Sequence, residues 1–297
     1  MRGAVTESTA PRLAARAGAA GPRVSVVMPT YRRPHQIGDA IRSLLAQSWT
    51  DFELLVRDDG DGADGTREAG LAAAGGDPRV RYHRNPTPLR MPGNLNGGIE
   101  ATRGEVVAVC HDHDLYRPEF LAEMLGALDR NPSALFVHCA IEVINQEGRP
   151  LASHVGEWPE LTPGAEWLKF MLGGLSCPVC ALTLVRREAH ERFGLYDPAH
   201  GFISDAELWM RLARHGDVAY VARPLIQVRE REEGHHADAN AIPLTHSIAR
   251  IHRRYLPLAY RGGTRLLRRA ALEARLARTV LRIRASQVKA RATGRGA

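Results

Sequence analysis

Acidic side chains gather in two short segments whose spacing suits the binding of a divalent cation. Asp112 and Asp114 flank His113 at the end of a buried apolar run, and Asp58 and Asp59 open a second acidic turn. Carboxylate oxygens are ligands that Mn²⁺ and Mg²⁺ accept while positions stay open for phosphate oxygens. An ion held there would neutralise the charge of a departing phosphate group.

These acids also have structural interpretations. Aspartates after strands commonly cap the following helix, which would leave Asp112 and Asp114 without a metal. A zinc site built from Cys110, His111 and His113 is another alternative, although it lacks a partner at zinc-ligand spacing. Phosphate binding by a glycine-rich loop is disfavoured, because the chain has no GxGxxG after its first strand and no GxxxxGK[ST].

The elements that must position these side chains follow an α/β pattern. From Arg23 onward, short β-branched runs alternate with segments of helical period, which predicts a parallel or mixed sheet flanked by helices. Strands are expected at 24–28, 52–56, 80–83, 106–110, 181–185 and 218–221, and helices at 34–48, 94–102, from 118 and at 204–215. The acidic segments then follow the second and fourth strands, and open α/β sheets bind ligands beyond the carboxyl ends of their strands.

Composition separates a near-neutral body from a basic end. The chain has 297 residues, 44% of them hydrophobic and 25% charged, as in ordinary globular proteins. Residues 261–297 hold eleven Lys or Arg against the single acid Glu273, a net charge of +10 within a chain total of +7. The remainder is therefore slightly acidic, which argues against nucleic-acid binding. The tail is expected to be a helix that either adsorbs to an anionic membrane or docks on the domain with a solvated face.

Several features indicate a cytoplasmic location. No run approaches the roughly 20 apolar residues of a membrane span. Residues 1–22 lack the apolar block of a secretory signal and are expected to be a disordered leader. The four cysteines are expected to be reduced thiols that pack in the core as small hydrophobic residues. Cys177 and Cys180 form a lone CxxC, which is a weak zinc or redox signal without a second pair.

A set of short motifs lies in sequence order along residues 24–224. The motifs are VVMPTY at 26–31, DDG at 58–60, NGGI at 96–99, DHD at 112–114 before Pro118, RRE at 186–188, FGLYD at 193–197, Asp205, and LWMRL at 208–212. Their order and spacing resemble the family 2 glycosyltransferases of the GT-A fold. The resemblance implies a mixed, mostly parallel sheet flanked by helices over 23–256, with a nucleotide-binding half (23–117), an acceptor half (118–256) and a helical tail (257–297).

The resemblance also implies an activity and a set of site residues. The reaction would be inverting transfer of a sugar from a nucleoside-diphosphate donor, with UDP or dTDP favoured, to a hydroxyl of a glycan, a lipid-linked or a small-molecule acceptor. Asp205 would be the general base that deprotonates this hydroxyl, and Mn²⁺ or Mg²⁺ would be the cofactor. The nucleotide-binding residues would be Pro29, Thr30, Tyr31, Asp59, Asn96 and Asp112, and the metal-binding residues Asp112, Asp114 and His113.

The sequence departs from the family pattern at three positions. His113 stands where an acid is common, Leu95 where an Arg is common, and Arg32 where an Asn is usual. A neutral imidazole is a competent Mn²⁺ ligand, so the first departure changes the ligand set and leaves the metal in place. His235 or His236 could add a late contact to the metal or the diphosphate, or belong to a solvated charge cluster.

Other assignments stay open at this point. Asp205 also begins a helical pattern, where an acid is stabilised by the helix dipole. Trp158 and Trp167 could stack on a sugar, although aromatic residues at this spacing are more often core. A sugar-nucleotide nucleotidyltransferase is one alternative function, and it would show a basic glycine-rich loop in place of Pro29-Thr30-Tyr31. A catalytically inactive nucleotide- or carbohydrate-binding protein is another, and Asp205 argues against it.

Overall fold

The computed structural model of the chain describes residues 21–174, 179, 183–230 and 241–292. Ten strands of these residues form one mixed sheet. The strands are β1 (Val24–Thr30), β2 (Phe52–Asp58), β3 (Val80–Arg84), β4 (Val106–Val109), β5 (Leu115–Tyr116), β6 (Ala134–Ile144), β7 (Pro150–His154), β8 (Leu161–Thr162), β9 (Leu184–Arg186) and β10 (Asp217–Arg229).

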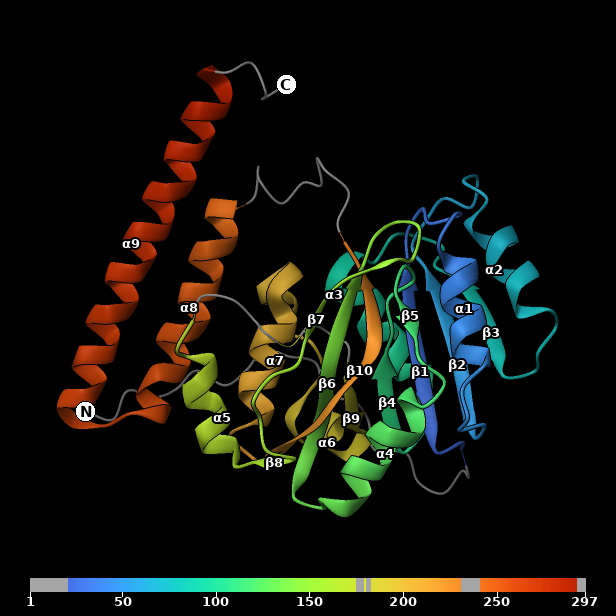
Figure 1. Cartoon of the computed structure of the whole chain (residues 1–297), viewed down its shortest axis with the longest axis horizontal. Coiled ribbons are helices and arrows are strands. Elements are labelled where there is room, and N and C mark those ends of the chain that lie inside the picture. The colour runs from blue at the N-terminus through green and yellow to red at the C-terminus, as the bar shows by residue number, and fades with distance from the viewer. Residues whose placement is uncertain (1–20, 175–178, 180–182, 231–240, 293–297) are drawn as a thin grey trace. The chain divides into compact units, whose positions relative to one another are not determined.

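The helices lie between these strands and after the last one (Figure 1). They are α1 (Ile37–Leu45), α2 (Thr66–Ala74), α3 (Arg90–Glu100), α4 (Phe120–Arg130), α5 (Gly164–Met171), α6 (Arg187–Phe193), the 3₁₀ helix η1 (Pro198–Ile203), α7 (Ser204–Leu212), α8 (Ala241–Ala259) and α9 (Gly262–Ala292). The predicted fold class, an α/β sheet flanked by helices with a helical C-terminal region, is confirmed.

The strand order brings six carboxyl ends to one edge of the sheet. The order is β3-β2-β1-β4-β9-β6-β10-β5, with β7 added beside β6 and β8 beside β10 (Figure 1). β1, β2, β3 and β4 are parallel, and β6 is parallel to β10. Because β9 runs antiparallel to both β4 and β6, all six of these strands point the same way. Polar residues that follow them therefore lie along a common edge.

The two faces of the sheet are covered by different helices. Alternate β1 residues Val26 and Met28 share a core with Ile37 and Ile41 of α1 and with the apolar face of α4. On the opposite face α3 packs on β1 and β2, where a Cβ on Gly98 would lie 2.4 Å from Val27 Cγ1. Glycine at this position lets the α3 backbone approach the sheet. The fully buried aliphatic side chains contribute about 1.5–3 kcal/mol each.

Most predicted elements exist, and their bounds shift by a few residues. The strand at 218–221 is much longer, since β10 extends from Asp217 to Arg229. The long strand β6 is absent from the predicted set, as are the short strands β5, β7 and β8. Seven consecutive β6 residues from Ala134 to Ala140 are buried, so its sequence shows no alternation of apolar and polar residues.

The described residues fall into two compact units. One contains the sheet and consists of residues 21–167, 179 and 183–230, and the other consists of residues 168–174 and 241–292. In the second unit α8 packs against α9, with Arg253 of α8 bonded to Glu273 of α9 at 2.6 and 2.8 Å. The predicted boundary at 256/257 falls inside α8, which contains Pro257. Within the described part of the chain, no helix has the length and apolarity needed to cross a membrane.

Candidate active site at the carboxyl edge of the sheet

The turn between β4 and β5 is fixed in place by the buried carboxylate of Asp114. This side chain is fully buried, and its Oδ1 accepts a hydrogen bond of 3.0 Å from the backbone N–H of Arg229 at the end of β10. The bond joins two strand ends that are distant in sequence and adjacent at the carboxyl edge. The residues of the turn, 110–114, are thereby held at that edge.

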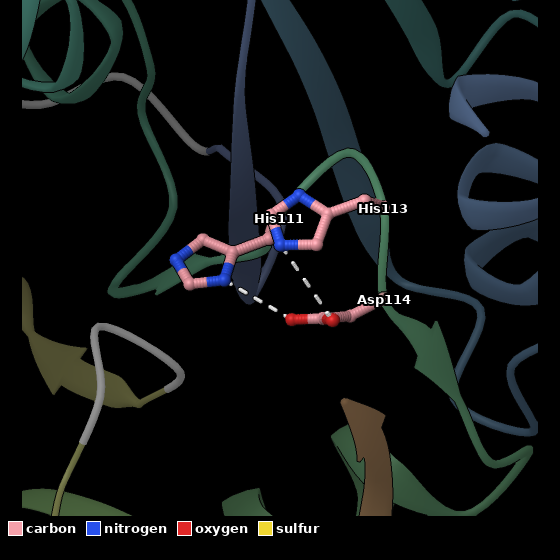
Figure 2. Close-up of side chains that lie close together, drawn as sticks. All are labelled: His111, His113 and Asp114. Atoms are coloured by element: carbon pink, nitrogen blue, oxygen red, sulfur yellow. Dashed lines mark hydrogen bonds and ion pairs between the residues drawn. The ribbon is translucent and has the colours of Figure 1, made fainter. Parts of the chain in front are cut away.

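Two histidines and Asp114 form a compact group of potential metal ligands (Figure 2). His111 Nδ1 lies 3.0 Å from Asp114 Oδ2, and His113 Nε2 lies 3.8 Å from Asp114 Oδ1. The imidazole rings stack with their centroids 5.3 Å apart. One ligand atom from each of the three residues lies within 4.8 Å of the others. Both rings are about 30% exposed, so one side of the group is open.

Asp112 contacts the ring nitrogen of His113 that is not near Asp114. Its Oδ1 is 2.9 Å from Nδ1 of His113, and the side chain is buried. Of the three predicted metal residues, the structure therefore brings His113 and Asp114 together with His111 and places Asp112 against the far nitrogen of His113. The sequence prediction considered His111 only for zinc, although an H-x-H-D run in a turn after a strand is a signal that could have found it.

Burial and charge act in opposite directions on this group. Burial lowers the pKa of His111, but the hydrogen bond and the charge of Asp114 outweigh it and leave that pKa above its ordinary value. Burial raises the pKa of Asp114, whereas the bond to His111, the charges of both histidines and the Arg229 N–H together hold it below its ordinary value. Asp114 is therefore ionised at neutral pH, as a metal ligand must be.

Asp205 occupies the first turn of α7, close enough to His111 for the two charges to interact. Burial raises its pKa to about 6, against the opposing effects of a 2.7 Å hydrogen bond from the Ala206 N–H and of the charge of His111. The electrostatic interaction between Asp205 and His111 also contributes to the raised pKa of His111. The start of α7 and the β4–β5 turn therefore lie near each other.

The motif after Asp205 holds α7 in this position. Glu207 and Arg211, one helical turn apart and both buried, form an ion pair of 2.9 Å. Arg211 also donates to the carbonyls of Phe193 and Leu195. The FGLYD and LWMRL motifs therefore form one buried structure that carries the partly buried Asp205.

The predicted nucleotide-binding residues lie at the ends of β1 and β2. Thr30 is buried, and its Oγ1 has no hydrogen-bond partner within the described parts of the chain. Tyr31 is 55% exposed, and the guanidinium of Arg32 lies 5.3 Å from its ring. Pro29 pairs in register with Arg57 of β2. These residues leave an exposed ring and an unpaired hydroxyl beside the acidic turn.

The other three predicted nucleotide contacts, Asp59, Asn96 and Asp112, are already hydrogen-bonded to the protein, Asp112 through its contact with His113. Asp59 accepts from Asn85 Nδ2 and Leu89 N at 2.8 Å through Oδ1, and from Arg90 N at 2.7 Å through Oδ2. Asn96 exchanges two bonds with the Tyr196 backbone, at 2.8 and 3.1 Å. Because β2 and β4 flank β1, their ends are about 10 Å apart, a span that a nucleotide covers.

The remaining predicted residues are core residues, the partly exposed Trp158, and residues outside the described ranges. Cys110 and Cys139 are buried free thiols, as expected. Trp167 is fully buried against Phe136, with ring centroids 5.4 Å apart, which confirms it as core. Trp158 is partly exposed and lies 6.2 Å from His138. Cys177, Cys180, His235, His236 and the leader up to residue 20 lie outside the described residues.

Comparison with known sequences gives a consistent family. The sequence profile described as glycosyl transferase family 2 matches residues 25–194. EpsE of Bacillus subtilis, a protein named as a glycosyltransferase, is 29% identical over 71% of this chain and 74% of its own length. A Campylobacter jejuni enzyme named GalNAc(5)-diNAcBac-PP-undecaprenol beta-1,3-glucosyltransferase is 30% identical over 41% of this chain, but only 39% of its own length is covered.

Comparison with solved structures supports the fold. TarS of S. aureus, crystallised as residues 1–349 in complex with UDP-GlcNAc, superposes with a TM-score of 0.60 at 17% identity, covering 87% of this chain and 71% of that one. GalNAc-T7, solved with UDP, GalNAc and Mn²⁺, gives a TM-score of 0.57 at 15% identity, covering 72% and 44%. At these identities the likeness describes the arrangement of the elements.

Proposed function

The chain belongs to glycosyl transferase family 2, and from that premise we propose that it transfers a sugar from a nucleoside diphosphate to an acceptor hydroxyl with inversion. The observation that carries this proposal is the meeting of two sets of groups at one edge of the sheet. Asp114 and two histidines come from the β4–β5 turn, and Asp205 comes from α7. One set suits a cation and a diphosphate, and the other suits an acceptor hydroxyl.

The residues of the turn fit a divalent cation. Two imidazoles and one ionised carboxylate offer three ligand atoms within 4.8 Å, with one side exposed for further oxygens. We assign Asp114 and His113 to a Mn²⁺ or Mg²⁺ ion and Asp112 to the support of His113. When bound, the ion neutralises the negative charge that develops on the leaving nucleoside diphosphate.

Asp205 is the general base of this proposal. With a pKa of about 6 it is ionised at pH 7 and above, and its basicity is higher than that of an ordinary aspartate. Its Oδ1 accepts the Ala206 N–H, which orients the carboxylate and leaves Oδ2 for the acceptor hydroxyl. Removal of this proton lets the acceptor oxygen attack the anomeric carbon opposite the leaving diphosphate, and a single displacement of this kind inverts the centre.

The nucleoside is assigned to the ends of β1 and β2. Tyr31 offers an exposed ring and Thr30 an unpaired hydroxyl beside Asp59. UDP or dTDP is the proposed carrier, supported by the UDP and UDP-GlcNAc complexes of proteins with this fold. Asp59 would accept the pyrimidine N–H in addition to the bonds that it makes to Leu89 and Arg90. Asn96 would support the pocket through its bonds to Tyr196.

We place the reaction in the cytoplasm, at the inner face of the membrane, on the basis of α9. Leu272 and Leu276 of this helix are buried, whereas Leu267 and Leu281 are 74% and 65% exposed. Exposed arginines surround these leucines, and a helix of this kind suits an anionic leaflet. A lipid-linked acceptor would be presented there, and the name of the Campylobacter relative describes such an acceptor.

A vesicle assay tests this placement. The full chain is expected to sediment with phosphatidylglycerol-containing vesicles and not with phosphatidylcholine alone. Replacing the exposed Arg278, Arg282 and Arg284 by Gln should weaken the binding by about fivefold for each arginine. The matched control is Arg149→Gln, an exposed arginine in the turn between β6 and β7. Equal sedimentation of the triple variant and the wild type would refute the contact.

A thermal-shift panel tests the donor assignment. UDP- and dTDP-sugars with Mn²⁺ are expected to raise the Tm, by the equivalent of about 2.7 kcal/mol at 100 times Kd. The same nucleotides with EDTA should give a much smaller shift. A nucleotidyltransferase would instead consume a nucleoside triphosphate and a sugar phosphate and release pyrophosphate. Stabilisation only by GDP-sugars, or equal shifts with and without metal, would contradict the proposal.

A further inference from the structure

The ligand set at the β4–β5 turn contains two nitrogens and one carboxylate. The DxD pattern of the sequence pairs Asp112 with Asp114, yet only Asp114 belongs to the compact group, and His111 completes it (Figure 2). From this arrangement we propose that His111 is a metal ligand and that the site selects a first-row transition-metal ion, such as Mn²⁺, Co²⁺ or Zn²⁺, over Mg²⁺. The inference rests on the proposed function for the presence of an ion and goes beyond it in ligands and selectivity.

The hydrogen bond from Asp112 determines which nitrogen of His113 is available. His113 Nδ1 lies 2.9 Å from Asp112 Oδ1, and because a carboxylate is an acceptor, Nδ1 carries the proton of the neutral ring. Nε2 then has the free lone pair, and it is the nitrogen on the Asp114 side, 3.8 Å from Oδ1. A carboxylate behind a metal-binding histidine fixes its tautomer and ring orientation. Asp112 is therefore a positioning residue for His113.

His111 approaches Asp114 from the other side. Its Nδ1 donates to Oδ2 at 3.0 Å, and a cation in contact with both atoms would take the place of that proton. Ligands about 2.1 Å from a common ion are at most about 4.2 Å apart. The ligand atoms lie within 4.8 Å of one another, so the widest pair needs to close by at least about half an ångström. The 14° angle between the rings shows that both imidazoles present their edges in similar planes.

Ligand chemistry then determines the metal. Mg²⁺ requires hard oxygen ligands and keeps its water, whereas imidazole nitrogen suits the later first-row ions. Because two of the three protein ligands are nitrogens, the site should bind the transition-metal ions of the Irving–Williams series more tightly than Mg²⁺. The partly exposed rings leave room for oxygen ligands from solvent or from a diphosphate.

Pulsed EPR of Mn²⁺ added to the full chain without nucleotide tests the ligand assignment. Two directly coordinated ¹⁴N nuclei are expected in the wild type, and one in His113→Ala. His111→Asn, which keeps an N–H for Asp114, should also show one, and its Tm and circular dichroism establish that it is folded. The control His154→Ala, an exposed histidine of β7, should keep both nitrogens. Asp112→Asn should weaken Mn²⁺ binding by about 10- to 100-fold.

Competition measures the selectivity. A 100-fold excess of Mg²⁺ should leave the Mn²⁺ signal of the protein in place. Mn²⁺ bound without nitrogen coupling, coupling unchanged in His111→Asn, displacement by equimolar Mg²⁺, or no binding of Mn²⁺ at all would each overturn the inference. Sugar transfer with an oxygen-only Mg²⁺ site would overturn this inference and leave the proposed function intact. A nitrogen-ligated ion in a chain that consumes no sugar nucleotide would support the ligand assignment and overturn the proposed function.

Discussion

Replacing Asp205 by Asn separates its role as a base from its position at a helix N-terminus. Loss of a general base lowers the rate by about 10²- to 10⁴-fold. The wild-type rate should fall about tenfold per pH unit below the pKa of about 6, as the carboxylate is protonated. The residual rate of the variant should lack this dependence. The assay is nucleotide release from a UDP-sugar, with water or an added sugar as the acceptor.

The same substitution should stabilise the fold. Burial raises the pKa of Asp205 from 3.8 to about 6, so the ionised carboxylate destabilises the folded state as the pH rises through this interval. The full shift corresponds to about 3 kcal/mol, which is an upper estimate for a half-buried group. Asp205→Asn removes the charge, and its Tm should therefore exceed that of the wild type at pH 8 but not at pH 4.

The matched control is Glu188→Gln. Glu188 also occupies the first turn of a helix, α6, but is exposed. Its replacement should leave the rate unchanged and change the stability by less than about 0.5 kcal/mol. An Asp205→Asn variant that keeps a tenth or more of the rate, with the wild-type pH profile, would refute the role as base. Equal losses of transfer rate in Asp205→Asn and Glu188→Gln would indicate an effect of helix stability alone.

Three further predictions concern packing, acid stability and metal dependence. Gly98→Ala should destabilise the fold by about 1–3 kcal/mol in urea unfolding, since its Cβ would meet Val27 at 2.4 Å; Gly126→Ala, in the interior of α4, meets only the flexible end of Arg130 and should be neutral or stabilising. Burial lowers the pKa of His138 to about 3, so its neutral form contributes stability that is lost as the pH falls below 6.5. When the pH falls from 7 to 5, the free energy of unfolding of His138→Phe should decrease by about 2 kcal/mol less than that of the wild type. Equal decreases would contradict a neutral, buried His138. Removing divalent ions with EDTA should weaken UDP binding in calorimetry at least tenfold, and Asp114→Ala should abolish this difference between the metal-loaded and EDTA-treated chain. A Kd for UDP that EDTA leaves unchanged would contradict binding of the diphosphate through a metal ion.

The sequence predicts the first half of the fold well because its strands and helices have clear periods. Ile37, Ile41 and Leu44 of α1 are all fully buried, as their spacing indicates. The sequence predicts the second half less well. β6 is a continuous buried run that periodicity cannot distinguish from a buried helix, and its partner β10 is more than 70 residues away.

The site divides in the same way. Motif spacing directs attention to the 112–114 turn and to Asp205, because strand ends and helix starts fix where those residues fall. The roles within the turn do not follow from spacing. Side chains of a turn have no fixed period, so nothing in the sequence indicates that His111 faces Asp114 while Asp112 faces His113. The occupied carboxylate of Asp59 likewise depends on the path of residues 85–90.

A crystal structure of the chain with UDP and Mn²⁺, recorded at a wavelength that gives manganese an anomalous signal, would show directly whether the ion, the diphosphate and Asp205 meet at the β4–β5 turn. We expect one anomalous peak in contact with Asp114, diphosphate oxygens bound to that ion, and Asp205 on the side of the diphosphate where an acceptor would lie. A UDP molecule bound elsewhere, or a diphosphate without an ion beside Asp114, would contradict this expectation.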